Sequence, residues 1–268
     1  MKSNSSIAFS LAEKTGFIAL LLALLFCFST PALAAVPLVL YLLLCIGAPF
    51  FPGIPFYLSV ISRGGQGTTG VALTFDDGPS PSSTPILLDL LARHGLPATF
   101  FVVGKRAAAH PELIADILNH GHTIGNHSWR HDNFLMLRSR KTLEKDIRAT
   151  QQILQQAGIE PHVFRPPAGA TNPHLAQVLA TVNLIPVNYS CRALDRGNKN
   201  ITNLAGKILA RLQPGDIIML HDLPPSEEKL SDYWQQELAH LFTALRNNYI
   251  ILPLEEIIHH PVMTDNRQ

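Results

Sequence analysis

The sequence predicts an α/β fold, a distorted barrel of seven β/α units that follows an apolar N-terminal segment. From residue 70 onward, short apolar runs alternate with stretches of helical periodicity, which is typical of a parallel sheet with crossover helices. Several runs are continuously apolar, as buried parallel strands are. Because there are seven runs, we expect an incomplete or distorted barrel and not a closed eightfold one.

The alternation defines one domain over residues 70–258, followed by a tail at 259–268. Candidate strands lie at 71–75, 98–103, 123–124, 163–164, 185–189, 216–220 and 249–252, of which the third and fourth are the weakest. Candidate helices lie around 84–93, 111–119, 139–157, 173–180, 201–212 and 233–246. A chain of 268 residues has room for this domain and an extension.

The extension, residues 1–61, contains two apolar runs. Basic residues precede the run at 17–28, and an Ala-x-Ala sequence follows at 32–34, which is the layout of a secretory signal. We therefore interpret residues 1–35 as a signal peptide or first membrane helix, and residues 36–61 as a second hydrophobic membrane segment. The glycine-rich stretch 62–69 is interpreted as a flexible linker.

Two membrane topologies are compatible with these runs. If the first run is cleaved or stays as an anchor, the second lies in or across the membrane, and the domain faces out of the cytoplasm; this is the topology we favour. If both runs cross as a hairpin, the positive-inside rule places Lys2, Lys14 and Arg63 in the cytoplasm together with the domain. In both cases the protein is attached to the membrane.

The composition narrows the range of partners and ligands. The net charge is +1 and charged residues are 15% of the chain, with no basic stripe interleaved with aromatics, so no nucleic-acid partner is expected. The three cysteines, Cys27, Cys45 and Cys191, form no CxxC pair. Metal ligands in this chain would therefore be oxygen and nitrogen rather than sulfur.

Polar residues follow several predicted strands, at or shortly after the strand end. In a β/α barrel the C-terminal strand ends converge on one face, where the active site lies. Agreement among independent positions predicts one site on that face. These residues are Asp76, Asp77, His127, Arg165, Asp195 and His221.

The pair His127 and His131 predicts a metal site. Imidazoles four residues apart can lie on one side of a turn and reach one metal, with a carboxylate as third ligand and an open fourth position. Asp76 and Asp77 are adjacent carboxylates that repel each other unless a cation is near. Because neighbouring side chains of an extended strand point differently, one can bind the metal while the other faces a bound water.

Two further segments have features of an active site. In Arg165-Pro166-Pro167-Ala168-Gly169, each proline fixes φ, so the segment can hold Arg165 and aim backbone N–H groups at an oxyanion. His221 ends a strand that should be buried, and a buried histidine needs a partner. Asp195 and Asp222 are the two candidates.

Three motifs occur in a familiar order: Thr-Phe-Asp-Asp-Gly at 74–78, His-Ser-x-x-His at 127–131 and Arg-Pro-Pro-x-Gly at 165–169. On these motifs, residues 68–258 resemble the polysaccharide deacetylases of carbohydrate esterase family 4, the NodB-homology domain. The resemblance implies a distorted (β/α)7 barrel of the NodB-homology type. It also implies metal-dependent hydrolysis of an N-acyl amide on a sugar.

The resemblance assigns a role to each matching residue. Asp76 would be the general base, oriented by Arg165, and His221 the general acid, tuned by Asp195. The metal would be zinc, with cobalt or nickel as alternatives. Its ligands would be Asp77, His127 and His131.

The chain departs from the family at two places. Ala168 stands where the family often has an aromatic residue; its N–H can still serve an oxyanion hole, but one wall of the sugar site is lost. The family's Asp-x-x-Asp-Trp segment reads Arg192-Ala193-Leu194-Asp195-Arg196. Arginines at the rim suit an anionic, phosphate-bearing substrate, so Arg192 and Arg196 are assigned to substrate binding with Ala168.

The expected function is removal of an N-acyl group, normally acetyl, from an amino sugar of a cell-envelope polysaccharide or peptidoglycan. Two alternatives stay open. One is a deacylase or deformylase of a lipid-linked sugar phosphate, which the apolar anchor and the two arginines would suit. The other is a glycan-binding membrane protein with an inactive site. The expected partners are therefore an N-acylated glycan and the membrane.

Overall fold

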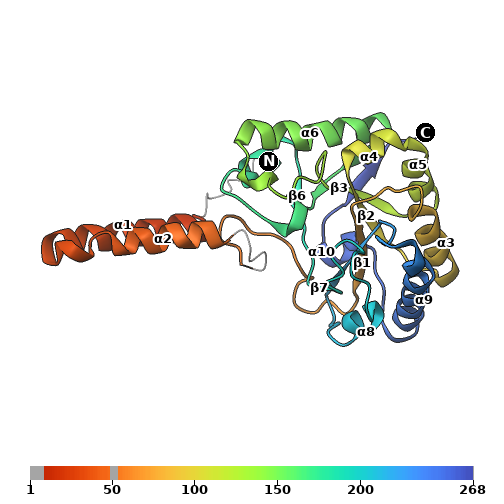
Figure 1. The fold of residues 1–268 in the computed structure, drawn as a ribbon. Coiled ribbons are helices and arrows are strands. Elements are labelled where there is room, and N and C mark those ends of the chain that lie inside the picture. Colours follow the sequence, from red (N-terminus) through yellow and green to blue (C-terminus); the bar gives the residue numbers. More distant parts are fainter. Residues whose placement is uncertain (1–8, 49–53, 268) are drawn as a thin grey trace.

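The computed structural model describes residues 9–48 and 54–267. Figure 1 shows a rounded α/β domain from which a pair of helices, α1 (Leu11–Ser29) and α2 (Val36–Gly47), extends to one side. In the domain, helices lie around a central sheet.

The sheet has seven strands in the order β6-β5-β3-β2-β1-β8-β7, and each neighbouring pair is parallel. The predicted parallel α/β architecture is thus confirmed. The central strand β1 is buried at all five positions, which explains why it reads as a continuous apolar run in the sequence. The strands are β1 (Ala72–Asp76), β2 (Thr99–Val102), β3 (Thr123–Asn126), β5 (Val163–Phe164), β6 (Ile185–Pro186), β7 (Cys191–Arg192) and β8 (Ile217–His221).

The sheet curls until its two edges come close. Edge strand β6 ends at Pro186 and the opposite edge strand β7 begins at Cys191, and five peptide steps span at most about 17 Å. The chain before the domain lies along these edges. Ile61 N donates to Pro186 O at 3.1 Å, and Gly64 N donates to Gly215 O at 2.8 Å, next to the start of β8. We call residues 61–64 the seam segment; the predicted linker 62–69 begins within it.

Amphipathic helices cover the outer face of the sheet. Helices α3 (Thr84–His94), α5 (Pro111–Asn119), α8 (Leu204–Leu209) and α9 (Ser231–Asn248) pack their apolar faces on β1, β2 and β8, while α6 (Arg140–Gln156) and α7 (Leu175–Thr181) cover β5 and β6. In α3, Leu87, Leu88 and Leu91 repeat at helical spacing and are buried. The helix ends at Gly95, whose φ of +62° suits a left-handed C-cap.

The interior of the barrel holds an apolar cluster that includes the first residues of β1, β5 and β8. Phe101, Val187 and Ile217 pack there with Ile257 from the short helix α10 (Leu254–Ile258), and Ile61 of the seam segment packs against the same cluster. The packing leaves the C-terminal strand ends as the open face, where a site can form.

The prediction of a seventh strand at 249–252 was wrong. Only Ile251 forms an isolated bridge, to Val71, because Pro253 immediately caps α10 and Ile250 is 57% exposed. The seventh strand is instead β7, two residues that are too few to give a periodic signal.

The sequence pattern also did not predict three other short elements, β4, β9 and α4. Strand β4 (Ile159–Pro161) pairs antiparallel with β9 (Met263–Asp265), so the predicted tail 259–268 is attached to the domain. Val262 just before β9 is fully buried. Helix α4 (Gly104–Ala109) has only six residues.

Small residues bring α1 and α2 into contact. Ala12, Ala19 and Ala23 are the buried positions of α1, and a Cβ on Gly16 would lie 2.9 Å from the Tyr41 ring. Such small side chains allow close helix packing. By length and apolar composition α1 could cross a membrane, whereas α2 has 12 residues. The predicted segment 36–61 lies partly outside the described residues, at 49–53.

Candidate active site

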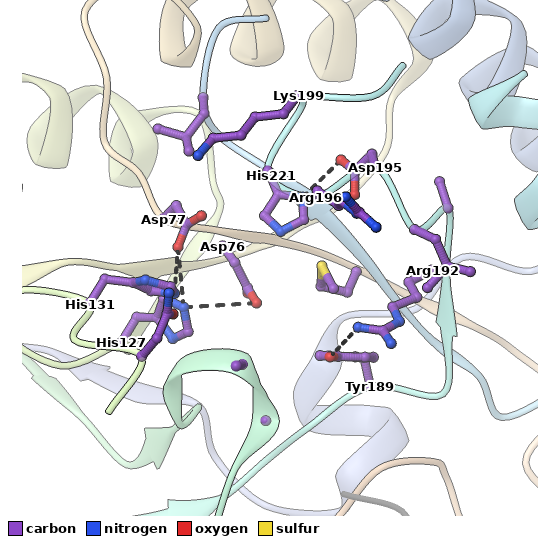
Figure 2. A pocket seen from close by; sticks show the side chains of 18 of the residues that line it. Asp76, Asp77, His127, His131, Tyr189, Arg192, Asp195, Arg196, Lys199 and His221 are labelled. Atoms are coloured by element: carbon purple, nitrogen blue, oxygen red, sulfur yellow. Dashed lines mark hydrogen bonds and ion pairs between the residues drawn. The ribbon is translucent and has the colours of Figure 1, made fainter. Parts of the chain in front are cut away.

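A cavity of about 910 Å³ opens at the C-terminal ends of the strands. Most of the residues singled out from the sequence line it, and they come from the ends of different strands and the loops that follow them (Figure 2). They are Asp76, Asp77, His127, His131, Ala168, Arg192, Asp195, Arg196 and His221. Arg165 lies beneath them, fully buried.

The predicted metal ligands form one cluster. Asp77 Oδ1 lies 3.4 Å from His127 Nε2 and 3.0 Å from His131 Nε2, and one ligand atom from each residue lies within 4.8 Å of the others. His127 follows β3, and its Nδ1 is 2.7 Å from Arg165 O. Because that bond fixes the ring, Nε2 is directed at Asp77.

The cluster fits a divalent metal by the chemistry of its donors. One carboxylate oxygen and two imidazole nitrogens are a common zinc-type set with an open position. Asp77 Oδ1 is buried and makes no hydrogen bond of regular geometry within the described residues, although both imidazole nitrogens face it; a cation between these three atoms would satisfy it.

The electrostatics of the cluster point the same way. Burial raises the pKa of Asp77, but hydrogen bonding and charge from His127, with His131 and His221, hold it well below its usual range. Burial lowers the pKa of His127, yet Asp76 and Asp77 raise it above its ordinary value. The negative charge of the two carboxylates thus favours a proton on His127, and a bound metal would displace that proton.

Arg165 holds Asp76 from below. Its Nη1 donates to Asp76 Oδ1 at 2.6 Å and to Thr74 Oγ1 at 2.8 Å, and its other nitrogens donate to the carbonyls of Val187 and Asn188. A guanidinium with this many partners has one orientation. The other oxygen, Asp76 Oδ2, faces the cluster of candidate metal ligands and lies 4.0 Å from His127 Nε2.

His221, at the end of β8, is paired with Asp195. The distance from His221 Nδ1 to Asp195 Oδ2 is 2.8 Å, so His221 Nε2 is the nitrogen left for the cavity. Burial lowers the pKa of His221, but the hydrogen bond and charge of Asp195, with Asp77 and Asp76, raise it above its ordinary value.

The other candidate partner, Asp222, is turned away from His221. Its carboxylate accepts from Ser83 Oγ at 2.7 Å and from Thr84 Oγ1 at 2.6 Å. Burial raises the pKa of Asp222 to about 6 against these hydrogen bonds. Asp222 therefore ties the end of β8 to the start of α3, next to the loop that contains Asp77.

Comparisons with known proteins identify the family. Residues 63–187 match the family model described as polysaccharide deacetylase. The chitooligosaccharide deacetylase of Sinorhizobium fredii is 34% identical over 204 residues, which are 73% of this chain and 94% of that protein. The chain belongs to the polysaccharide deacetylase family. The predicted family is thereby confirmed.

Further members of the polysaccharide deacetylase family agree in sequence and in structure. A peptidoglycan-N-acetylglucosamine deacetylase of Bacillus cereus is 34% identical over 154 residues, 57% of this chain and 72% of that protein. The crystal structure of the Bc1960 peptidoglycan N-acetylglucosamine deacetylase has a TM-score of 0.68 at 29% identity, covering 76% of this chain and 94% of that one. The barrel type expected for the family is therefore the one observed.

Sequence reasoning missed two polar residues in this polysaccharide deacetylase site. Asn198 is buried, and its Nδ2 donates to His221 O at 3.1 Å and to Leu223 O at 2.6 Å. Tyr189 Oη accepts from Arg192 Nη1 at 3.0 Å. The turn dipeptide Gly197-Asn198 was a signal for the first; nothing in the sequence pointed to the second.

Backbone strain is concentrated around the cavity. Ten described non-glycine residues have positive φ, and seven of them lie in its loops. Outside glycine, asparagine and aspartate this conformation is costly and clusters at functional sites. The seven are Asp77, Ser128, His131, Ala168, Leu194, Arg196 and Asn198.

Proposed function

We propose that this protein is a metal-dependent N-deacetylase that hydrolyses the acetamide of an amino sugar in a cell-envelope glycan. The observation that carries the proposal is the meeting, in one cavity, of three units: the Asp76–Arg165 pair, the Asp77–His127–His131 cluster and the His221–Asp195 pair. Hydrolysis of an amide needs a base for water, polarisation of the carbonyl and an acid for the amine. The names of its relatives support an N-acetylamino-sugar substrate.

Asp77, His127 and His131 would hold the metal. A divalent metal, when bound there, supplies Lewis-acid polarisation of a carbonyl and lowers the pKa of water. The family and the donor set support metal dependence, with zinc as the first choice and cobalt or nickel as alternatives.

Asp76 is proposed to take a proton from the attacking water. Its Oδ1 is occupied by Arg165 Nη1, which leaves Oδ2 as the basic atom facing the cluster. Arg165 has no route to solvent and holds the carboxylate in one position. A base is most effective when its orientation is already fixed before the reaction begins.

On the opposite side, His221 is proposed to protonate the leaving amine. Asp195 fixes its tautomer and raises its pKa, which favours the protonated ring that a general acid needs. Ala168, with φ of +54° and an exposed position in the cavity wall, is proposed to offer its N–H to the developing oxyanion.

Acetate release tests the proposal. The purified full-length chain in detergent is stripped of metal, reloaded with zinc, cobalt or nickel, and incubated with N-acetylated chitooligomers and peptidoglycan fragments. We expect acetate from at least one glycan, dependent on the added metal. A metal-loaded protein that releases acetate from none of these glycans would point to the inactive glycan-binding alternative.

We also propose that the domain is attached to the membrane and faces out of the cytoplasm. The support is α1, which is long and apolar enough to span and precedes an Ala-x-Ala sequence at 32–34. Protease added to intact cells, and separately to spheroplasts, tests the orientation. Digestion of the domain in spheroplasts is expected; complete protection would favour the hairpin with the domain inside.

A further inference from the structure

Basic side chains are concentrated in the active-site cavity. Seven of the chain's 21 lysines and arginines line it, although the net charge of the whole protein is only +1. The three acids of the cavity wall are Asp76, Asp77 and Asp195, and each is already engaged by Arg165, by the two ligand histidines or by His221. The seven basic residues are Arg106, Arg130, Arg192, Arg196, Lys199, Lys207 and Arg211.

None of these seven forms an ion pair with a carboxylate in the described part of the chain. Elsewhere, arginines such as Arg93, Arg148 and Arg267 do pair with acids. Unpaired like charges around one concave surface repel each other and raise the local positive potential. The arrangement is favourable only when an anion enters.

The basic residues are unevenly distributed between the two sides of the cavity. Five of them come from the single stretch 192–211, which also contains Asp195. Figure 2 shows Arg192 and Arg196 on the side of Asp195 and His221, away from His127 and His131, whereas the Lys199 side chain crosses above the cavity toward Asp77. Both arginines therefore lie on the side of the proposed acid.

Contacts hold the side chain of Arg192 and the backbone of the loop that carries Arg196. Arg192 donates to Tyr189 Oη at 3.0 Å, and its guanidinium lies 5.4 Å from the centre of the Tyr189 ring. Arg196 is in a left-handed conformation, φ +55°, in a loop that buried Asn198 fastens to the carbonyls of His221 and Leu223. Cations with a fixed position lose little freedom on binding an anion.

We propose that the amino sugar hydrolysed here carries a phosphate group, recognised by Arg192 and Arg196. The inference rests on the proposed function, because it uses the reaction to orient the substrate. If His221 protonates the leaving amine, the sugar lies on the His221 side and the acyl group lies toward Asp77, His127 and His131. Charge on the His221 side therefore recognises a substituent of the sugar and not of the acyl group.

A phosphate suits this side better than a carboxylate does. The planar guanidinium fork binds phosphate oxygens through two parallel bonds, and a phosphate presents more oxygens and more charge than a carboxylate. Two arginines can bind one phosphate or diphosphate together. The same head group could be a soluble sugar phosphate or the head of a lipid-linked one.

Matched substrates test the inference with the full-length, metal-loaded chain in detergent. Acetate release is compared for the methyl glycoside of N-acetylglucosamine, its 1-phosphate and 6-phosphate, a carboxylate-bearing muropeptide fragment, and the same sugar on a polyprenyl diphosphate in mixed micelles. We expect kcat/KM to be at least tenfold higher for a phosphorylated substrate than for the methyl glycoside. Added salt should reduce the difference, because it screens the charges.

Variants connect the preference to its residues. Arg192→Gln and Arg196→Gln should each lower the ratio of kcat/KM, phosphorylated over neutral substrate, by about tenfold, which is the usual scale of one charged hydrogen bond. Arg246→Gln, an exposed position on α9 outside the cavity, is the matched control and should leave the ratio unchanged. Inhibition by inorganic pyrophosphate, expected to weaken in the two variants, gives a second measurement.

The outcomes separate this inference from the proposed function. If the methyl glycoside or the muropeptide is turned over as well as or better than the phosphorylated substrates, the inference of a phosphate-bearing substrate is wrong, while the deacetylase assignment stands. No acetate from any substrate overturns the deacetylase assignment itself. Preference for the soluble phosphates or for the polyprenyl-linked sugar supports the inference and says which source the phosphate has.

Discussion

At the scale of single residues, the site separates two neighbouring carboxylates into different tasks. Asp76 and Asp77 are adjacent in sequence, yet Asp76 Oδ1 contacts Arg165 and Asp77 Oδ1 faces His127 and His131. The difference arises at the end of β1, where Asp76 is the last strand residue and Asp77 takes φ of +74°. The backbone at this point therefore directs one side chain to the two imidazoles and the other to an arginine.

This division predicts that activity and metal content can be lost separately. Asp76→Ala and His221→Ala should lower turnover by about 10²- to 10⁴-fold each, the usual contribution of a general base or acid, with metal near one per chain. Asp77→Ala and His131→Ala should lose the metal as well. Acetate release and elemental analysis of the same samples give both quantities. Loss of metal in all four variants to the same extent would refute the division.

A second residue-scale prediction concerns pH. Burial lowers the pKa of His221, and the hydrogen bond and charge of Asp195, together with the charges of Asp77 and Asp76, raise it above its ordinary value. In Asp195→Asn the charge of Asp195 is gone, so the pKa of His221 falls. Because the acid must be protonated, activity disappears as pH rises through that pKa, and the alkaline limb of the kcat/KM profile should move to lower pH. An unchanged limb would mean that another group is titrating.

At the scale of elements, the predictable part of the fold was the part with long periodic runs. Strand β1 and helices α3 and α9 could be placed because their apolar positions repeat at the spacing of a buried strand or an amphipathic helix. Strand β7 could not, since two residues have no period and pairing with β8 alone defines it. The motif residues were found because each follows a strand; Asn198 and Tyr189 lie in loops whose conformation only tertiary contacts determine.

The loops after β1 and β8 touch at one glycine, and this contact can be tested at the scale of elements. A Cβ on Gly78 would lie 2.1 Å from Asp222 Oδ2 and 2.9 Å from Asp222 Cβ. Gly78→Ala must push these loops apart, and we expect a loss of about 1–3 kcal/mol in the free energy of unfolding, as for other overpacked sites. Denaturant titration measures it. Gly65→Ala, where a Cβ meets nothing within 4 Å, is the control. Equal losses of unfolding free energy in the two variants would show that Asp222 can move aside without cost.

At the scale of the whole molecule, part of the chain before the domain belongs to the barrel. Ile61 packs against the interior cluster with Val187 and Ile217, and Arg63 Nη2 lies 2.7 Å from buried Asp216 Oδ1. Helices α1 and α2 precede this seam segment in the chain. The seam segment is thus held to the domain by packing and an ion pair, as well as by the covalent chain.

The seam segment predicts where the domain can be cut. A chain that starts at residue 54 keeps Ile61 and Arg63, while a chain that starts at residue 68 exposes the interior cluster and leaves Asp216 without its arginine. Burial of one isoleucine contributes about 1.5–3 kcal/mol, and a domain of this size loses about 2–4 °C of Tm per kcal/mol. We therefore expect the shorter chain to melt about 5–10 °C lower. Thermal denaturation of the two chains, with Arg63→Ala in the longer one, separates the packing from the ion pair; equal melting temperatures would mean that residues 61–64 are only a tether.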